Sequence, residues 1–445
     1  MRCNDGHFEE WTNCEWISAG KHKLPILNLK VICYSLLGGL HWEQVHSFFS
    51  KCGIPLVSSA TYYRYLKNLI YPVIYDHWLR NQADALKDLL RAQKNKGEGV
   101  KIAGDGRFDS PGWSAKYCTY IIQALKTNKI ICFMVASKQQ VNSSAAMEVF
   151  ALKSLLTFLI SCGLNIVTLV TDRSSSVRGM MQSEFSFINH QFDPWHLVKN
   201  IKNNLIKVSK LASCAILKPW IKSIVNMLWW SLDTSKGDPD VARHKIMSIL
   251  NHTSGIHHFA ELTLFPECAH GESVNNKPWL PFIGYVKDKL RTIIFGRDGK
   301  NLADLKHYTE CCQTSEIESF NSLILKYSNK TYSYGWLGMY IRTCIAALDW
   351  NSNTERAQKV NSKGELMYRI KVNRFGIRTV VPVKVEKSYH WQDSIFQSCV
   401  SAFEAEDIPH HEYPVGDDSV QLSEEFNKQE AISKLQCRIG KISEE

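Results

Sequence analysis

Residues 99–105, GVKIAGD, and residues 165–172, NIVTLVTD, are two apolar runs that each end in an aspartate. The second run is almost continuously apolar, which is typical of a strand buried on both faces of a sheet. Two further strands are predicted between them, in YCTYIIQALKT and KIICFMVAS, divided by a turn at Thr127-Asn128. These segments predict the centre of an α/β domain.

Helices are predicted around the later strands. Ser144 is expected to cap an amphipathic helix that ends at Gly163. A short helix in SSVRGMMQSEF, a fifth strand in INHQFD and a helix in PWHLVKNIKNNLIKV follow Asp172. Three strands, a helix, a strand, a helix and a strand are the order of the ribonuclease H-like fold, whose first and fourth strands lie side by side. Asp105 and Asp172 are therefore expected at neighbouring strand ends.

The predicted fold class is α/β: a ribonuclease H-like mixed sheet flanked by helices, with a large helical insertion and a helical N-terminal region. Ser58 or Ser59 is expected to cap one N-terminal helix, in a helix-turn-helix unit or in a bundle that packs on the next domain. Five parts are predicted: 1–98, the helical region with a partial zinc module; 99–200, the first part of the core; 201–312, the insertion; 313–360, the completion of the core; and 361–445, an extension with an acidic flexible tail.

Composition narrows the class of protein. A chain of 445 residues with 44% hydrophobic content is long enough for two or three domains with real cores. The net charge of +10 favours a polyanionic partner. No apolar run long enough to span a bilayer and no signal-peptide region are expected, so no membrane partner is predicted. Fourteen irregularly spaced cysteines indicate reduced thiols in the nucleus or cytoplasm.

Three acidic residues are the candidate catalytic and metal-binding groups: Asp105, Asp172 and a glutamate in QTSEIESFNSLI. Two aspartates and a glutamate can hold a pair of divalent ions about 4 Å apart, an arrangement used to cleave phosphodiesters. The alternatives are a turn at Asp105-Gly106 and a helix cap at Asp172. Glu316 and Glu318 point about 200° apart on a helix, and periodicity leaves open which of them faces the site.

The segment Asp193-Pro194-Trp195-His196 predicts a helix start, with Asp193 as the cap and proline at the first helical position. His196, a further candidate catalytic residue, then lies in the first turn, where it could orient a phosphate or a water. No acidic residue follows Asp193 until Asp233. That stretch is either a solvated helix face or a phosphate-contacting surface, and its lysines are Lys199, Lys202, Lys207, Lys210, Lys218 and Lys222.

Cysteine and histidine pairs offer only weak metal sites. Cys3 and His7, with Cys14 nearby, form half of a zinc site, which needs four ligands. Cys268 with His270, and Cys311 with Cys312, are further candidates. Free thiols explain each of these pairs better.

Several segments together resemble a group of eukaryotic DDE transposases, whose relatives include domesticated, transposon-derived genes. They are DGRFDSPGWSAKYCTY, VTDRSSSV, HQFDPWHLVKNI, QTSEIESFNSLILKYSNKTY and RTCIAALDWN. The resemblance extends from about residue 1 to about residue 390. It implies a ribonuclease H-like catalytic core, two Mg²⁺ or Mn²⁺ ions, double-stranded DNA at transposon ends as the partner, and a homo-oligomer acting on that DNA in the nucleus.

The resemblance also assigns residues. Asp105 and Asp172 match the first two acids, and Glu318, followed by Asn321, matches the third better than Glu316 does. Asp193 and His196 resemble the acid-x-x-His signature that follows the second acid. Arg107, Arg173, Lys199, Lys202, Lys207 and Lys210 are the expected DNA contacts.

Two positions and the opening segment depart from the family pattern. Ser174 and Asn321 stand where histidines are frequent in the family. The opening segment resembles only the second half of a zinc module, which points to truncation and leaves a possible structural Zn²⁺ dependent on an upstream half. The predicted function is metal-dependent DNA cleavage and strand transfer. The alternatives are a domesticated, catalytically decayed copy that binds DNA or partners, and an RNA-directed or structure-specific nuclease on the same fold.

Overall fold

The computed structural model of the chain describes residues 14–110, 115–141, 143–271, 276–310, 314–372 and 378–414. At its centre lies a five-stranded sheet in the spatial order β5-β4-β3-β6-β7. β3 is antiparallel to β4 and parallel to β6, so the sheet is mixed. The predicted fold class, a mixed α/β sheet flanked by helices, is confirmed. The strands are β3 (Val100–Phe108), β4 (Tyr117–Ala124), β5 (Ile130–Ser137), β6 (Ile166–Thr171) and β7 (Asn189–Phe192).

β3 continues beyond its predicted end at Asp105. Its pairing with β6 ends at Ala103 opposite Val170, whereas its pairing with β4 extends to Phe108 opposite Cys118. Asp105 therefore lies in extended backbone, on the part of β3 that projects past β6. The alternative of a turn at Asp105 is wrong, because the antiparallel partner holds this segment straight.

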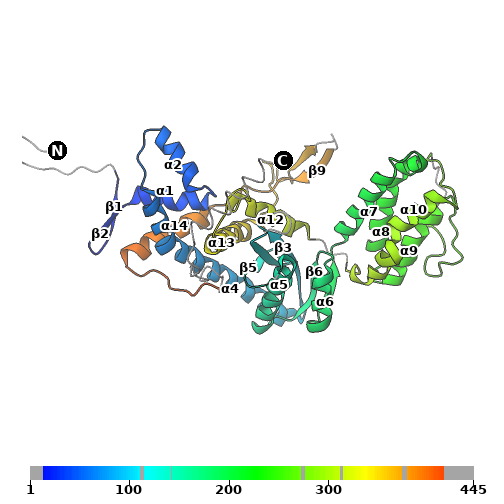
Figure 1. Cartoon of the computed structure of the whole chain (residues 1–445), viewed down its shortest axis with the longest axis horizontal. Coiled ribbons are helices and arrows are strands. Elements are labelled where there is room, and N and C mark those ends of the chain that lie inside the picture. Colours follow the sequence, from blue (N-terminus) through cyan, green and yellow to red (C-terminus); the bar gives the residue numbers. More distant parts are fainter. Residues whose placement is uncertain are drawn as a thin grey trace, which may run out of the picture.

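One face of the sheet is covered by α5 (Ser144–Ser161) and α6 (Ser175–Glu184) (Figure 1). The cap of α5 is Ser143, whose hydroxyl accepts a hydrogen bond from the backbone N–H of Ala146, one residue earlier than predicted. Contrary to expectation, α5 is long and apolar enough to cross a membrane by length and composition. Its buried side chains, which include Met147 and Leu156, pack into the core beneath the sheet, as in the central helix of a globular domain.

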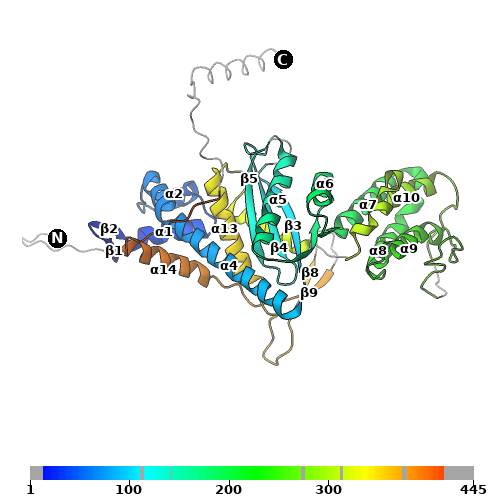
Figure 2. The ribbon, with the colours of Figure 1, turned by 90° about the horizontal axis from the view of Figure 1, so that it is seen from below.

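The other face of the sheet packs against α4 (Tyr71–Lys96), α12 (Ser315–Tyr327) and α13 (Trp336–Asn353). The same hydrophobic cluster continues into the N-terminal helices and α14 (His390–Glu404), so both ends of the described chain share one core. Figure 2 shows α4 lying between α13 and α14.

The N-terminal region is not wholly helical, because residues 16–25 form an antiparallel hairpin that the sequence did not predict. Ser58 accepts a hydrogen bond from the backbone N–H of Thr61 and caps α3, one of the two predicted capping positions. The elements are β1 (Trp16–Ala19), β2 (His22–Pro25), α1 (Ile26–Leu37), α2 (Trp42–Lys51), α3 (Ser59–Tyr65) and a π-helical turn (Leu66–Ile70) that continues into α4.

A helical lobe is inserted between β7 and α12, at one end of the molecule (Figure 1). It has its own hydrophobic core, with Leu205, Leu217, Leu228, Ile249 and Leu290 fully buried. Its α-helices are α7 (Pro194–Val208), α8 (Ile221–Asp233), α9 (Pro239–His252), α10 (Tyr285–Phe295) and α11 (Lys300–Ala303). Its 3₁₀ turns are Ala212–Trp220, Arg297–Gly299 and Asp304–His307.

The C-terminal part contains more structure than its composition indicated. β8 (Tyr368–Val372) and β9 (Arg378–Pro382) form an exposed antiparallel hairpin, and α14 packs on α1 and β1. The residues predicted as an acidic tail lie outside the described part from position 415 onward.

Candidate active site

The parallel pairing of β3 with β6 places Asp105 and Asp172 at the same edge of the sheet. Lys101 lies opposite Thr168, and Ala103 lies opposite Val170. Two residues further along the same register, Asp105 comes beside Asp172. Asp172 is not a helix cap, because Ser174 caps α6 with its hydroxyl.

His196 lies next to Asp172 because α7 begins directly after β7, and β7 pairs with β6 up to Phe192 opposite Thr171. The ring nitrogen Nε2 of His196 lies 3.1 Å from Oδ1 of Asp172. The same nitrogen lies 3.2 Å from Oε1 of Glu318 on α12. The imidazole of His196 therefore links Asp172 at the edge of the sheet to Glu318, which lies more than a hundred residues later in the sequence.

Of the two competing glutamates, Glu318 faces this site and Glu316 is exposed. The helix buries Ile317 and Phe320 on the side that packs on the protein core, so Glu318 lies at the border of that side. Asn321, one turn later, donates a hydrogen bond of 2.6 Å from Nδ2 to Oδ2 of Asp105. One helix, α12, therefore contacts both aspartates. Glu318 is linked to Asp172 through His196, and Asn321 binds Asp105 directly.

Asp193 positions both helices of the site, because the two oxygens of its carboxylate bind the starts of α7 and α12. Its Oδ1 accepts a hydrogen bond of 2.7 Å from the backbone N–H of Trp195, which caps α7 as predicted. Its Oδ2 accepts a hydrogen bond from the hydroxyl of Thr314 and one of 3.2 Å from the Thr314 backbone N–H. Asp193 is only 2% exposed, so it is a buried link between the starts of α7 and α12.

The clustered acids repel one another in the absence of a cation. Burial, and after it the charge of Asp172, raises the pKa of Asp105 to about 7. Burial also raises the pKa of Asp172, against the influence of His196. An excess of negative charge at one point is the electrostatic setting in which carboxylates bind metal ions.

Glu148 is a fourth acid near this site that the sequence analysis missed. Burial and the charge of Asp172 raise its pKa, and its Cγ lies 3.4 Å from the position that a Cβ on Gly106 would take. It lies near the start of α5, and β5 runs parallel to β3, so the topology brings α5 to the same edge as Asp105. An acid in an otherwise apolar helical segment, AAMEVFALKSLL, was the available signal.

The glycines beside Asp105 serve the packing of Tyr120. A Cβ at Gly104 would lie 2.7 Å from the Tyr120 hydroxyl, and one at Gly106 would lie 3.3 Å from its Cδ2. The Tyr120 hydroxyl is buried and has no hydrogen-bond partner among the described residues. Larger residues at either glycine would push this ring away from β3.

The profile of the Mutator-like transposase family matches residues 17–268, which is more than half of the chain. The chain belongs to the Mutator-like transposase family. The matched segment contains Asp105, Asp172 and His196 and ends before Glu318. The predicted resemblance to a transposase is thereby confirmed.

Among solved structures, the Drosophila P element transposase strand transfer complex is similar, with a TM-score of 0.31 and 13% sequence identity. The alignment covers 74% of the chain described here and 92% of the P element transposase chain. No curated protein sequence matches the chain described here.

The predicted DNA-contacting residues of this transposase fall into two groups. Arg107 is 7% exposed and donates from Nη2 to the Ser328 carbonyl at 3.0 Å, so it ties β3 to the end of α12. Arg173 pairs with Asp304 and donates to Oδ1 of Asn301 at 2.9 Å, so it fastens the insertion to the sheet. Both arginines are thus held by protein groups.

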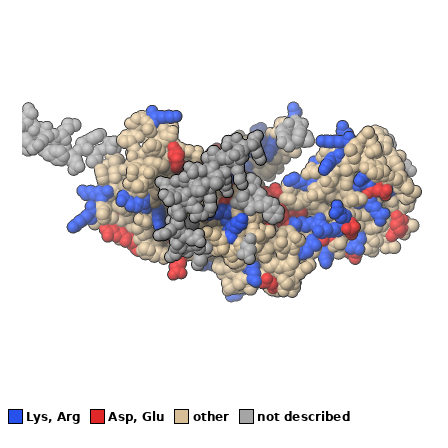
Figure 3. Space-filling model, in the orientation of Figure 1, with Lys and Arg blue, Asp and Glu red and all other residues tan. Residues whose placement is uncertain are grey.

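The lysines of α7 and the following turn lie on the surface. Those predicted as DNA contacts are all exposed: Lys199, Lys202, Lys207 and Lys210. Lys199 is nearest to the acids, with Nζ 3.9 Å from the ring centre of Trp195 and a charge that acts on Asp172. In Figure 3, Lys and Arg side chains gather over the part of the insertion nearest the rest of the molecule.

A hollow of about 350 Å³ opens beside the acids between α7 and α12, lined by Asp193, Trp195, Ser315, Glu318, Ser319 and Ser322. The predicted zinc residues Cys3, His7, Cys311 and Cys312 lie outside the described residues. Cys268 and His270 lie in the insertion, away from this hollow.

Proposed function

We propose that this transposase cleaves DNA and transfers strands at a DDE site formed by Asp105, Asp172 and Glu318 on a ribonuclease H-like core. The observation that carries the proposal is the meeting of three acids from two adjacent strand edges and one distant helix around His196 and Asn321. A half-buried cluster of acids that forms no ion pair with Lys or Arg among the described residues carries unbalanced negative charge, which a bound cation would offset.

The donor set fits two Mg²⁺ or Mn²⁺ ions. These cations prefer carboxylate oxygens, and Asp105, Asp172 and Glu318 supply them, with Glu148 close to Asp105. When bound, such ions favour deprotonation of an attacking hydroxyl and offset the charge that develops on the phosphate.

The remaining residues of the site have positioning roles. Asn321 holds the carboxylate of Asp105 in one orientation through its amide hydrogen bond. His196 keeps Asp172 and Glu318 together, and Asp193 fixes the helices on which His196 and Glu318 lie.

Double-stranded DNA at transposon ends is the proposed substrate, bound in part by the exposed lysines of α7. Phosphate contacts by lysine supply sequence-independent affinity, which suits a surface that adjoins a phosphodiester-cleaving site. We also propose that the protein acts in the nucleus and as a homo-oligomer on its DNA.

Nicking of supercoiled plasmid in Mn²⁺ or Mg²⁺ tests the proposal. Asp105→Asn, Asp172→Asn and Glu318→Gln keep side-chain size and should each slow nicking at least about 100-fold, equivalent to about 3 kcal/mol in the barrier. Glu316→Gln, on the exposed side of the same helix, should nick at the wild-type rate. If wild type nicks no faster than these neutralised variants, the proposal fails, and a copy that only binds DNA or partners is favoured.

A further inference from the structure

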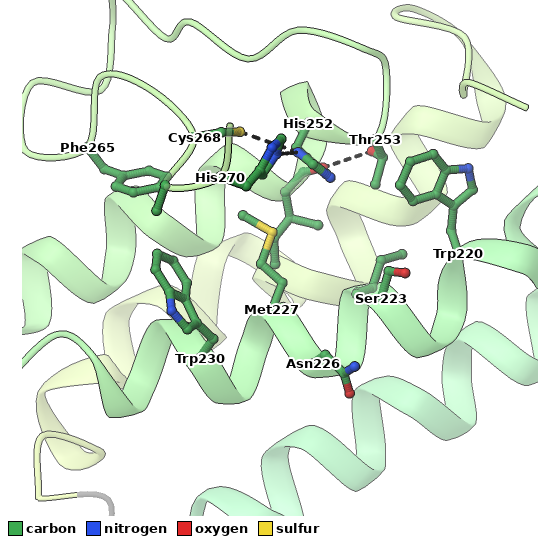
Figure 4. A pocket seen from close by; sticks show the side chains of 13 residues that line it. Trp220, Ser223, Asn226, Met227, Trp230, His252, Thr253, Phe265, Cys268 and His270 are labelled. Atoms are coloured by element: carbon green, nitrogen blue, oxygen red, sulfur yellow. Dashed lines mark hydrogen bonds between the residues drawn. The ribbon is translucent and has the colours of Figure 1, made fainter. Parts of the chain in front are cut away.

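Three histidines and one cysteine of the insertion converge at the end of α9. They are His252, His257, Cys268 and His270, and their ligand atoms all lie within 4.8 Å of one another. Figure 4 shows the side chains of His252, Cys268 and His270 pointing toward one another above a cavity in the lobe. None of the four belongs to the proposed DDE site.

The backbone after α9 is folded to bring these residues together. His252 is the last residue of the helix, and Gly255, with φ of 81°, reverses the chain. The N–H of Cys268 then donates a hydrogen bond of 3.0 Å to the carbonyl of His257. In the same loop the N–H of Phe259 donates to the carbonyl of Pro266. A loop of more than ten residues is thereby closed with His257 and Cys268 opposite each other.

The distances between the ligand atoms are those of a tetrahedral metal site. Zn–N bonds of about 2.0–2.1 Å and Zn–S bonds of about 2.3 Å place neighbouring ligand atoms about 3.3–3.6 Å apart. Sγ of Cys268 lies 3.3 Å from Nδ1 of His252 and 3.4 Å from Nδ1 of His257. Nε2 of His270 lies 3.4 Å from Nδ1 of His252.

The three imidazole rings repeat this geometry. Their centroids are 5.1, 5.2 and 5.1 Å apart, and each pair of rings is almost perpendicular, at 82–85°. With each ring centre about 1.1 Å behind its nitrogen, three imidazoles on a tetrahedral zinc have centroids about 5.1 Å apart. A chance cluster of histidines has no reason to adopt this threefold arrangement.

The hydrogen bond of His270 to the backbone also orients its ring for binding a metal. Its Nδ1 lies 2.7 Å from the carbonyl oxygen of Gly271, and only a protonated nitrogen can bond to that acceptor. In the neutral ring Nε2 then carries a lone pair that points toward the cluster. Histidines that bind metal characteristically donate their other N–H to such a partner.

We propose that His252, His257, Cys268 and His270 bind one structural Zn²⁺. Imidazole and thiolate ligands in a tetrahedral arrangement select zinc over Mg²⁺, and four protein ligands close the site to substrate. On binding, the Cys268 thiol releases its proton to solvent and the thiolate bonds to the metal. The ion fastens the loop after α9 over a cavity of about 320 Å³ lined by Trp220, Met227, Trp230 and Phe265.

Metal analysis of the purified full chain tests this site. Wild type should carry about one zinc per chain, and after its removal Co²⁺ should give the intense visible bands of tetrahedral coordination with a thiolate charge-transfer band. His257→Ala and Cys268→Ala should lose at least tenfold in zinc affinity. His258→Ala is the matched control, because His258 is adjacent in sequence but largely exposed and faces Glu267; it should keep its zinc.

Several results would overturn the inference. One is wild type without zinc and without a tetrahedral Co²⁺ spectrum, a measurement that does not depend on any variant folding. Another is His257→Ala with the zinc content of His258→Ala, and a third is stoichiometric copper or iron in place of zinc. An Asp105→Asn, Asp172→Asn double variant should retain its zinc, which separates this site from the carboxylates.

Discussion

Oδ2 of Asp193 accepts a hydrogen bond of 3.2 Å from the backbone N–H of Thr314, across 121 positions of sequence. The other oxygen of the same carboxylate caps α7. One buried side chain therefore sets the relative position of the helices that carry His196 and Glu318. The helical lobe leaves the sheet at α7 and returns to the core at α12. Because Asp193 binds the starts of both helices, the length of the lobe need not disturb the site.

Replacement of Asp193 by alanine should damage both stability and cleavage. It removes a helix cap, at about 1 kcal/mol, and leaves the buried Thr314 N–H without a partner, at about 1–3 kcal/mol. We expect DNA nicking to fall at least tenfold because Glu318 is no longer held beside His196. Chemical denaturation and plasmid nicking measure the two effects.

Asp238→Ala is the matched control for this variant. Asp238 caps α9 in the same way, before a proline, but is exposed and contacts only its own helix start. It should lose about 1 kcal/mol of stability and keep its nicking rate. Equal losses of nicking in both variants would contradict a special role for Asp193.

Asn321→Asp should inactivate the site while the fold is kept. An ionised aspartate is only an acceptor, so it cannot donate to Asp105 and adds a like charge within hydrogen-bond distance. We expect at least a tenfold slower nicking rate in single-turnover assays. Glu316→Gln, on the exposed side of the same helix, is the control and should nick normally. A fully active Asn321→Asp variant would exclude this role for the amide.

The sequence predicted the parts of the site that depend on strand order. Apolar runs ending in Asp105 and Asp172 indicated neighbouring parallel strands, and the start of α7 followed from Asp193-Pro194. The projection of β3 past β6 was not predictable, because it depends on which partner strand is longer.

The rest of the site depends on contacts between distant segments. The choice of Glu318 over Glu316 came from resemblance, since helical periodicity does not show which side of α12 meets the sheet. The bond from Asp193 to Thr314 leaves no local pattern, and neither does Glu148. His252 and His257 were missed for a similar reason: a helix end and a loop bring them to Cys268 without paired spacing. The strands of the hairpin β1–β2 have only four residues each, too few for an alternating pattern to stand out. The hairpin β8–β9 has no buried position that could show alternation.

His190 should make the fold sensitive to acid. Burial lowers its pKa to about 4, and its Nε2 lies 2.9 Å from the Thr171 hydroxyl in β6. In the unfolded chain a histidine has a pKa of about 6.5, so the unfolded state binds the proton first as the pH falls. Above about pH 6.5 His190 is neutral in both states and does not lower the free energy of unfolding. Between about pH 6.5 and pH 4 that free energy falls progressively, by about 3 kcal/mol.

His190→Gln removes this titration and isolates it from the opposing effect of the buried acids. When the pH is lowered from 7 to 4.5, the unfolding free energy of wild type should fall by more than that of the variant. Chemical denaturation at the two pH values measures it. A difference that stays constant would show that His190 does not carry this sensitivity.

The lysines of α7 should contribute to DNA affinity in a manner that depends on salt. Each lysine that neutralises a phosphate contributes about 0.9 to the slope of log affinity against log salt. Lys199→Ala with Lys202→Ala should therefore reduce this slope by about 1.8, without a preference for any DNA sequence. Lys94→Ala with Lys96→Ala removes the same charge from exposed positions at the end of α4, which precedes the start of β3 and lies away from the acids. Fluorescence anisotropy at several salt concentrations should show the wild-type slope for that control pair, and equal slopes in the two double variants would mean that α7 is only a solvated helix face.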